Sequence, residues 1–447
     1  MPSMAEANTA KTPSQATWWQ VAICGAIAAW GLGWSTWRIA TEGPGVLGVN
    51  NAVPWGWDIA LFVYWIGLGH AGTLISAVLL LTRKSWRAPI AHYAEWMTLC
   101  AAVTAAVFPL VHVGRAWMIW QASPLPVSSG VWPHAGSALM WDAAAISGYI
   151  ALSAMFLWMG LQGERARSLG IDRTWARSCM LMAGALTPTV VLVHSVVACD
   201  FATVLRWRWA LMPPFFVCGA LLSGMAVALL IALWKRCETP VREKLSQLTL
   251  ALGLTMGLFY AFELLESPEQ WGAEYALMLL LNVGLPCIFF IPVARASKYT
   301  AAFVACGVLV GMWVERSLII ISRSISATGG SYSPSPVDMA MMAGSVGLFL
   351  ALFLAGSRLF LNRHAEEPQM PLQDVPREPG KWAGIGAILG FLAALGWLLF
   401  TQGVDTAGSA GHRPEGLFYA FPILTIATLG GAGTSLFIYL HRRLRKK

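Results

Sequence analysis

Charged side chains are scarce in this chain: Asp, Glu, Lys and Arg make up 12% of its 447 residues, and 57% of the residues are hydrophobic. A soluble domain carries about 25% charged residues. The composition therefore excludes an ordinary water-soluble protein and indicates a helical protein that crosses a membrane many times. The net charge of +8 comes from short basic clusters between apolar runs, which argues against nucleic-acid binding.

The cysteines are not spaced to hold a metal centre. All eight stand singly, and the chain has no Cys-x-x-Cys and no Cys-x-x-Cys-His. Iron–sulfur clusters, zinc sites and c-type haems use such closely spaced ligands. We therefore expect this chain to bind no metal, haem or iron–sulfur cluster of its own, so that electrons reaching it must pass to another subunit.

Long apolar runs fill most of the chain. A helix needs about 20 apolar residues to cross a bilayer. The predicted fold is an all-α integral membrane protein with about 12 transmembrane helices, placed at 18–38, 59–82, 94–119, 138–161, 178–201, 211–234, 248–266, 275–294, 300–321, 338–361, 382–401 and 417–440.

Basic residues between the runs predict the orientation. Most Lys and Arg residues fall before the first run or in every second connection after it, near 83–87, 165–177, 235–244, 295–298, 358–381 and 442–447. Cytoplasmic connections are enriched in Lys and Arg. We therefore predict a multi-pass membrane protein with both termini in the cytoplasm, and we name the opposite side the outer side.

A segment at 362–381 divides the chain. It is rich in proline and charge and has no apolar period, as expected of a linker. We predict a membrane body over 1–361, a cytoplasmic linker over 362–381, and an extra two-helix hairpin with a basic tail over 382–447.

Ionisable residues gather near the outer ends of several predicted helices. Because such side chains are costly in a bilayer, they are functional candidates. His112 and Arg115 share a face of an ideal helix, whereas His194 and Asp200 are about 120° apart. The pattern predicts a polar pocket that opens outward. Its candidate residues are His112, Arg115, Asp142, His194 and Asp200 in the first half, and Glu263, Glu266, Glu315 and Arg316 in the second.

Each of these residues also has a structural interpretation. His112 can hydrogen-bond to a neighbouring helix, and Asp142 can cap the start of a helix. Glu315 can form an ion pair with the arginine that follows it, and Asp200 and Glu266 can face interfacial water. Their joint occurrence on one side of several helices favours a functional pocket.

His70 lies at the centre of the run 59–82. It could pair with a second histidine as a haem ligand, but no partner at a matching depth is evident. The surrounding residues 67–72 match G-x-G-x-x-G without a preceding strand, so nucleotide binding is not expected. We expect these small residues to allow close helix packing.

An outward polar pocket suits a lipid-soluble substrate that exchanges protons. A quinol releases two protons and two electrons, and it needs proton acceptors beside its ring oxygens. Imidazole and buried carboxyl groups transfer protons efficiently near neutral pH. His112 and Asp142 are the candidates for that catalytic pair, and a partner at the outer face would take the electrons.

Several stretches resemble one family of membrane proteins. They are VNNAVPWGWDI, WIGLGHAGTLISAVLLL, FPLVHVGR, LMWDAAAIS, HSVVACDFA and WVERSLIIISRS, in this order between residues 49 and 324. They are similar to the NrfD-like membrane subunits of polysulfide reductases, and specifically to the ActC-type quinol-binding subunit of alternative complex III. The resemblance covers roughly residues 20–361.

The resemblance implies two four-helix bundles, at about 59–201 and 211–321, flanked by one helix on each side. It implies a haem-free site for menaquinol or ubiquinol in the first bundle near the periplasmic surface, formed by His112, Asp142, His194 and Asp200, with Arg115 as a further candidate. It also implies proton movement through the bundles. The candidates for that pathway are His70, Glu263, Glu266, Glu315 and Arg316.

The same resemblance implies a location in a bacterial inner membrane. It also implies partners: an iron–sulfur subunit and a multihaem c-type cytochrome on the periplasmic side, and a second NrfD-like membrane subunit. The main hypothesis is the quinol-oxidising subunit of alternative complex III, a respiratory or photosynthetic electron-transfer enzyme. The first alternative is the quinone-reactive anchor of a molybdenum-dependent reductase, such as a polysulfide reductase. A secondary transporter is the second alternative, although transporters place their sites at the midplane on broken helices. The hairpin at 382–447 departs from the ActC pattern.

Overall fold

The computed structural model describes residues 16–118, 138–204, 211–266, 272–363 and 385, which are helical or connect helices, with no strand among them. The α-helices are α1 (Trp18–Glu42), α2 (Trp57–Thr73), α3 (Leu79–Leu81), α4 (Ala91–His112), α5 (Ala138–Leu161), α6 (Gly163–Ser168), α7 (Asp172–Val204), α8 (Met212–Trp234), α9 (Thr239–Glu266), α10 (Ala273–Leu279), α11 (Leu285–Cys287), α12 (Pro292–Ala296), α13 (Lys298–Ser317), α14 (Arg323–Thr328) and α15 (Pro336–Leu359).

Eight helical segments in the described part are long and apolar enough to cross a membrane, which confirms the predicted all-α membrane class. They are Trp57–Leu81, Ala91–His112, Asp172–Ala198, Met212–Trp234, Thr239–Leu265, Ala273–Phe290, Lys298–Ser326 and Pro336–Leu359. α1 and α5 coincide with two further predicted runs. The predicted runs at 382–401 and 417–440, and nearly all of the linker at 362–381, lie outside the described residues, so the total of about twelve stays a prediction.

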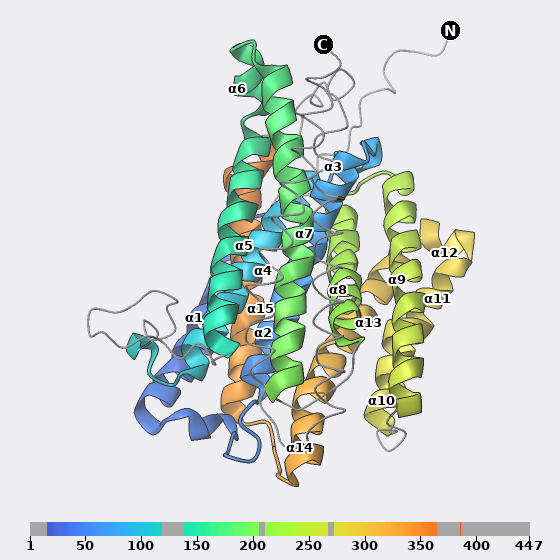
Figure 1. Cartoon of the computed structure of the whole chain (residues 1–447). Helices are drawn as coiled ribbons and strands as arrows, with labels where there is room; N and C mark the ends of the chain where they lie inside the picture. Colours follow the sequence, from blue (N-terminus) through green and yellow to red (C-terminus); the bar gives the residue numbers. More distant parts are fainter. Residues whose placement is uncertain (1–15, 119–137, 205–210, 267–271, 364–384, 386–447) are drawn as a thin grey trace, which may run out of the picture.

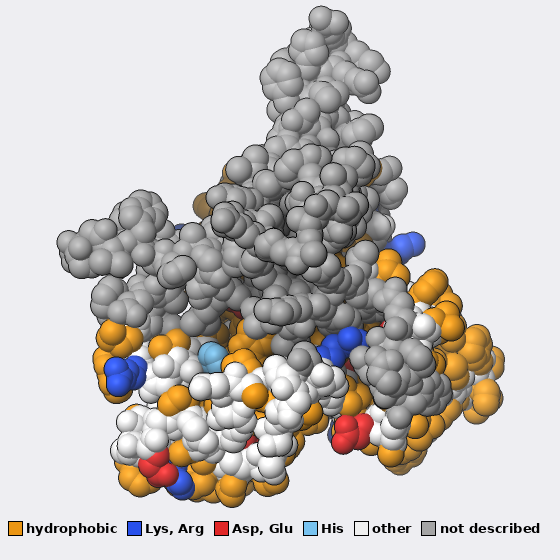
Figure 2. Space-filling view, turned by 60° about the horizontal axis from the view of Figure 1, so that its bottom comes forward, with side chains coloured by type: hydrophobic (Ala, Val, Ile, Leu, Met, Phe, Trp, Pro, Cys, Tyr) orange, Lys and Arg blue, Asp and Glu red, His pale blue; other side chains and the backbone are white. Residues whose placement is uncertain are grey.

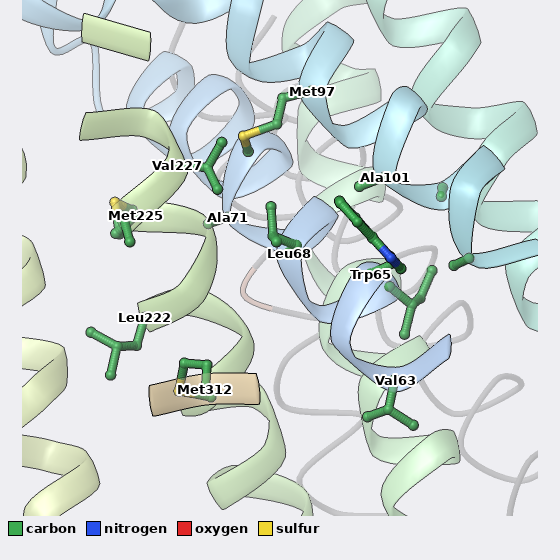
Figure 3. Close-up of a cluster of buried hydrophobic side chains, with 14 of the residues drawn as sticks. Val63, Trp65, Leu68, Ala71, Met97, Ala101, Leu222, Met225, Val227 and Met312 are labelled. Atoms are coloured by element: carbon green, nitrogen blue, oxygen red, sulfur yellow. The ribbon is translucent and has the colours of Figure 1, made fainter. Parts of the chain in front are cut away.

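α2 lies at the centre of the molecule (Figure 1). It packs against α4 on one side and α8 on the other, and all its residues from Asp58 to Thr73 except Tyr64 are buried. Figure 3 shows this contact: Leu68 and Ala71 of α2 lie between Met97 of α4 and Met225 of α8. α5 and α7 complete one group of helices with α2 and α4, and α8 packs with α9 and α13 in a second group.

Small residues bring α2 and α4 close together. A Cβ atom at Gly72 would overlap the Ala94 carbonyl oxygen, and one at Gly69 would lie 3.2 Å from the Thr98 carbonyl oxygen. Both glycines belong to the G-x-G-x-x-G match at 67–72. Its expected role in close helix packing is therefore confirmed.

α1 and α15, the two helices expected to flank the bundles on opposite sides, instead pack against each other (Figure 1). Gly31 of α1 meets Gly344 of α15 so closely that a Cβ atom at Gly31 would lie 2.6 Å from the Gly344 Cα atom. Facing glycines allow the two backbones to approach, which is a favourable way for helices to associate in lipid. α15 also packs on α4.

In the described part of the chain, a π-helical turn occurs at three places: Leu74–Val78 after α2, Leu280–Gly284 after α10 and Leu318–Ser322 after α13. Such wide turns occur frequently at functional sites, because they change the direction of the side chains that follow. The last two lie beside buried polar residues described below.

The two ends of the molecule differ. α5, α6 and α7 extend beyond the other helices at one end of the molecule, the upper end in Figure 1. This end carries the basic connection around α6, and the charge distribution predicts that it faces the cytoplasm. At the opposite end, the predicted outer side, backbone and uncharged polar groups cover much of the described surface (Figure 2).

Candidate functional site

A buried carboxylate and a histidine meet at the predicted outer end of the first group of helices. Asp58 lies in the first turn of α2 and is fully buried, and His112 is the last residue of α4. The His112 Nδ1 atom lies 2.6 Å from the Asp58 Oδ2 atom, and the His112 side chain is 25% exposed. When Nδ1–H donates to the carboxylate, the neutral ring keeps Nε2 as a proton acceptor.

The surrounding connections hold Asp58 in place. The backbone N–H of Gly56 donates to its other carboxylate oxygen, Oδ1, at 3.2 Å. The N–H of Trp57 donates to the Tyr332 hydroxyl oxygen at 3.0 Å. A Cβ atom at Gly56 would lie 2.9 Å from the Tyr332 ring, so a larger residue there would displace Tyr332. Burial, together with the charges of Asp338 and Asp58, raises the pKa of Tyr332 well above its ordinary value, so this residue stays a neutral phenol.

Sequence reasoning missed Asp58. It stands in the stretch VNNAVPWGWDI, directly after a connection rich in polar and small residues, where a carboxylate normally faces water. The structure buries it because the connection before α2 and the one around Tyr332 fold over the helix end. The signal that could have found it is the position of an acidic residue in the first turn of a long apolar helix.

Asp142 lies on α5, next to α4, and is buried. It is the fifth residue of this helix, Ala138–Leu161, so the interpretation as a cap at the helix start is wrong. It is near the same end as His112, because α4 ends and α5 begins at the lower end of the molecule in Figure 1.

Arg115 does not share a helical face with His112, contrary to the prediction. α4 ends at His112, and Gly114 has a φ of 71°, which turns the chain away. Arg115 is exposed beyond this turn. Asp200 and Glu266 fall on α7 and α9, and their side chains lie outside the described residues.

His194 lies beside His70, deeper in the same group of helices. The two ring centroids are 4.5 Å apart, and both side chains are buried. Twelve residues separate His70 from Asp58 on α2, which corresponds to about 18 Å along a helix axis. The expectation that His70 lacks a histidine at its own depth is therefore wrong, since α7 places His194 there.

The geometry of the histidine pair does not fit a haem. Rings that ligate one iron from opposite faces of a porphyrin lie farther apart than these, and the rings here are tilted by 57°. The His70 Nδ1 atom lies 2.5 Å from the Ile66 carbonyl oxygen, which fixes the ring orientation. Tyr149 packs against the His70 ring at 5.0 Å, and its hydroxyl group lies 3.0 Å from Thr73 Oγ1.

A second polar cluster lies in the second group of helices. Glu315 and Arg316 are buried and form an ion pair, with 3.0 Å between Nη1 and Oε1. The Tyr260 hydroxyl donates to Glu315, and the Asn282 amide donates to the Tyr260 oxygen at 2.9 Å. The predicted ion pair of Glu315 and Arg316 is thus confirmed, and Tyr260 and Asn282 are members of the cluster that sequence reasoning missed.

Glu263 reaches a different partner. Its Oε1 atom lies 2.5 Å from Nη2 of Arg323, at the outer end of the second group. Arg323 follows the π-helical turn Leu318–Ser322, which turns its side chain toward α9. Among the described residues no group of three or more His, Cys, Asp or Glu is arranged to hold a metal ion.

These features define a class: a multi-pass helical membrane protein with a buried carboxylate–histidine pair at one end and further polar clusters between apolar helices. The model of the polysulphide reductase, NrfD family matches residues 45–327. This range includes the Asp58–His112 pair, the His70–His194 pair and the Glu315 cluster, and the chain belongs to this family.

Curated relatives match along most of their length. A protein of Halobacterium salinarum named as a membrane subunit of a dimethyl sulfoxide reductase is 25% identical over 378 residues, 70% of this chain and 84% of the relative. A selenate reductase subunit of Mesobacillus selenatarsenatis is 20% identical, over 70% of this chain and 87% of the relative. The Hdr-like menaquinol oxidoreductase integral membrane subunit of Archaeoglobus fulgidus is 22% identical, over 75% of this chain and 90% of the relative.

Proposed function

We propose that this chain is the quinone-reactive membrane subunit of a multisubunit oxidoreductase, and that it oxidises quinol at the outer end of α2, α4 and α5. The observation that carries the proposal is the fully buried Asp58 bonded to His112 at 2.6 Å. Burying a carboxylate such as Asp58 at a membrane interface costs free energy, and such a cost is characteristic of functional sites.

His112 is the proposed first proton acceptor. Asp58 orients its ring and stabilises the imidazolium that forms when Nε2 takes a proton from a quinol hydroxyl. Asp142, on the adjacent helix at the same end, is the proposed acceptor for the second proton. Quinol thereby becomes quinone, two protons leave toward the outer side, and two electrons pass to an iron–sulfur partner.

Two arguments support oxidation rather than reduction of the quinone. Dimethyl sulfoxide and selenate reductases consume electrons where they reduce their substrates, so a membrane subunit that serves them must take electrons from a quinol. The third relative is named as a menaquinol oxidoreductase subunit. That name makes menaquinol the candidate electron donor for this chain.

The relatives favour the reductase anchor over alternative complex III. We therefore assign the chain first to a complex with an iron–sulfur subunit and a molybdenum-dependent catalytic subunit. Alternative complex III is the second candidate, supported by the ordered stretches between residues 49 and 324. It would bring a multihaem c-type cytochrome and a second NrfD-like membrane subunit.

The complex is assigned to the cytoplasmic membrane, with both termini in the cytoplasm, on the distribution of Lys and Arg. Purification from the native membrane in mild detergent, with mass spectrometry of the proteins that accompany the chain, separates the candidates. A molybdopterin protein would establish the reductase anchor, and a multihaem cytochrome would establish alternative complex III. A chain that purifies alone and neither binds nor oxidises quinol would refute both.

A further inference from the structure

The described chain continues beyond the range that matches the family, which ends at residue 327. The connection 329–335 and α15 follow, and α15 packs on α2 and on the short helical turn that precedes α2. The connection is tied to the same region, because Asn50 Nδ2 donates to the Ser331 carbonyl oxygen at 3.0 Å. Segments outside the matched range therefore lie directly against the start of α2, where the proposed quinol site is.

Tyr332 of this connection contacts both residues that precede Asp58. Its hydroxyl oxygen accepts the backbone N–H of Trp57 at 3.0 Å, and its ring lies against Gly56. The N–H of Gly56 in turn donates to Asp58 Oδ1 at 3.2 Å. The position of the first turn of α2, and with it the position of the Asp58 carboxylate, therefore depends on where Tyr332 lies.

Asp338, in the first turn of α15, is the residue of that helix that interacts with the Tyr332 hydroxyl group. It also belongs to a capping box: its Oδ2 accepts the Ser335 N–H at 2.8 Å, and Ser335 Oγ accepts the Asp338 N–H at 3.2 Å. A cap of this kind works equally well when it faces water. Asp338 is fully buried, which costs free energy that the cap does not require.

Two buried carboxyl groups thus lie near Tyr332, one on α2 and one on α15. Asp58 and Asp338 are close enough to act electrostatically on each other and on Tyr332. Carboxylates in a site of low dielectric constant repel each other. The Tyr332 hydroxyl group binds the start of α2 and interacts with Asp338, so it opposes the displacement of Asp58. Such a displacement would weaken the 2.6 Å bond from Asp58 to His112.

We propose that Tyr332 is a positioning residue for quinol oxidation, which holds Asp58 against His112 through the backbone of Gly56 and Trp57. Asp338 anchors the Tyr332 hydroxyl group from α15. Tyr332 acts through Asp58 and takes no proton itself. The inference rests on the proposed function and deepens it, because it makes the connection 329–335 and α15, which lie beyond the matched family range, part of the site.

Tyr332→Phe in the purified complex tests the role in turnover, because it keeps the ring on Gly56 and removes only the hydroxyl group. We expect kcat to fall about three- to tenfold, as for the loss of one neutral hydrogen bond, and KM to stay within about twofold. In the Asp58→Asn background the same substitution should cost less than about twofold, because both act on one interaction.

Tyr93→Phe is the matched control, because the Tyr93 hydroxyl group bonds to Lys235 and Asn362, each at 2.7 Å, at the opposite end of α4. Its kcat should stay near that of the unmodified chain. Equal losses in Tyr332→Phe and Tyr93→Phe, or a full additional loss in the Asp58→Asn background, would overturn the proposal.

A second measurement needs no quinol. Proton NMR of the complex with isotope-labelled histidine reports the His112 Nδ1–H signal, which is assigned by its loss in His112→Ala. A weaker bond to Asp58 should move this signal upfield in Tyr332→Phe. Gly56→Ala, which displaces the Tyr332 ring, should do the same and replaces Tyr332→Phe if that variant does not fold.

An unchanged His112 signal in Tyr332→Phe and Gly56→Ala would overturn the positioning role. A moved signal together with normal turnover in Asp58→Asn has a different meaning: Tyr332 then positions Asp58, but quinol is not oxidised at this pair. Failure of the inference is therefore distinct from failure of the proposed function.

Discussion

Replacing Asp58 by asparagine tests the proposed proton acceptor most directly. The substitution keeps the shape of the side chain but removes its charge. The bond to His112 Nδ1, 2.6 Å in the structure, then loses its charge assistance. An imidazolium formed at His112 during quinol oxidation would have no neighbouring carboxylate to stabilise it.

The size of the effect follows from the strength of that bond. Hydrogen bonds to charged groups contribute about 1.5–3 kcal/mol, and each 1.36 kcal/mol on a barrier changes a rate by about tenfold. We therefore expect kcat for quinol oxidation to fall by about 10- to 150-fold. KM for the quinol should change by less than about threefold, because the lost interaction strengthens only as the proton moves.

The assay is steady-state oxidation of a short-chain menaquinol analogue by the purified complex, with the protein composition of the complex checked for each variant. Glu95→Gln is the matched control: Glu95 is also buried and lies 3.3 Å from His92 Nδ1, but at the opposite end of α4. Its turnover should stay near that of the unmodified chain. Unchanged turnover in Asp58→Asn, or an equal loss in both variants, would refute the role of the Asp58–His112 pair.

Three further substitutions test the proton acceptor, the contact of α1 with α15, and the ion pair of Glu315 with Arg316. His112→Ala should abolish quinol oxidation while the complex still assembles; normal turnover of the assembled variant would remove His112 from the mechanism. Gly31→Leu should lower the unfolding temperature in detergent, because overpacking costs about 1–3 kcal/mol. Gly25→Leu should leave the unfolding temperature unchanged, because no atom lies within 4 Å of a Cβ there. Equal shifts in the two variants would contradict the close contact of α1 with α15. Arg316→Gln should destabilise the chain by about 3–5 kcal/mol, because it leaves a buried carboxylate unpaired. Adding Glu315→Gln should recover part of the lost stability in the same thermal assay. No recovery would mean that Glu315 and Arg316 are not energetically coupled.

The apolar runs predicted the helices well, because in lipid every backbone polar group must bond within its own segment. α8 and α9 cover the predicted runs 211–234 and 248–266, and α15 covers most of 338–361. The end of α4 was predicted less well, since the run at 94–119 continues past His112. Gly114 ends the helix there through its positive φ, which hydropathy does not detect.

The candidate site was predicted only in part. Placing His112 and Asp142 near the same end needed only their positions along two helices of predicted direction. The depth of His194 could not be predicted in this way, because it depends on where α7 begins and how far this helix extends. The structure brings His194 to His70, and it brings Asp58, which no pattern marked, to His112.

The sequence by itself determined that this protein is a bundle of membrane-crossing helices with polar residues inside it, because hydrophobicity and helix length are properties of each segment alone. The pairs that those residues form were decided only by the tertiary structure. Asp58 meets His112 over 54 residues of sequence and Tyr260 meets Glu315 over 55. Such contacts depend on the rotation, the depth and the close approach of helices at their small residues, which are properties of the packed bundle and of no single helix.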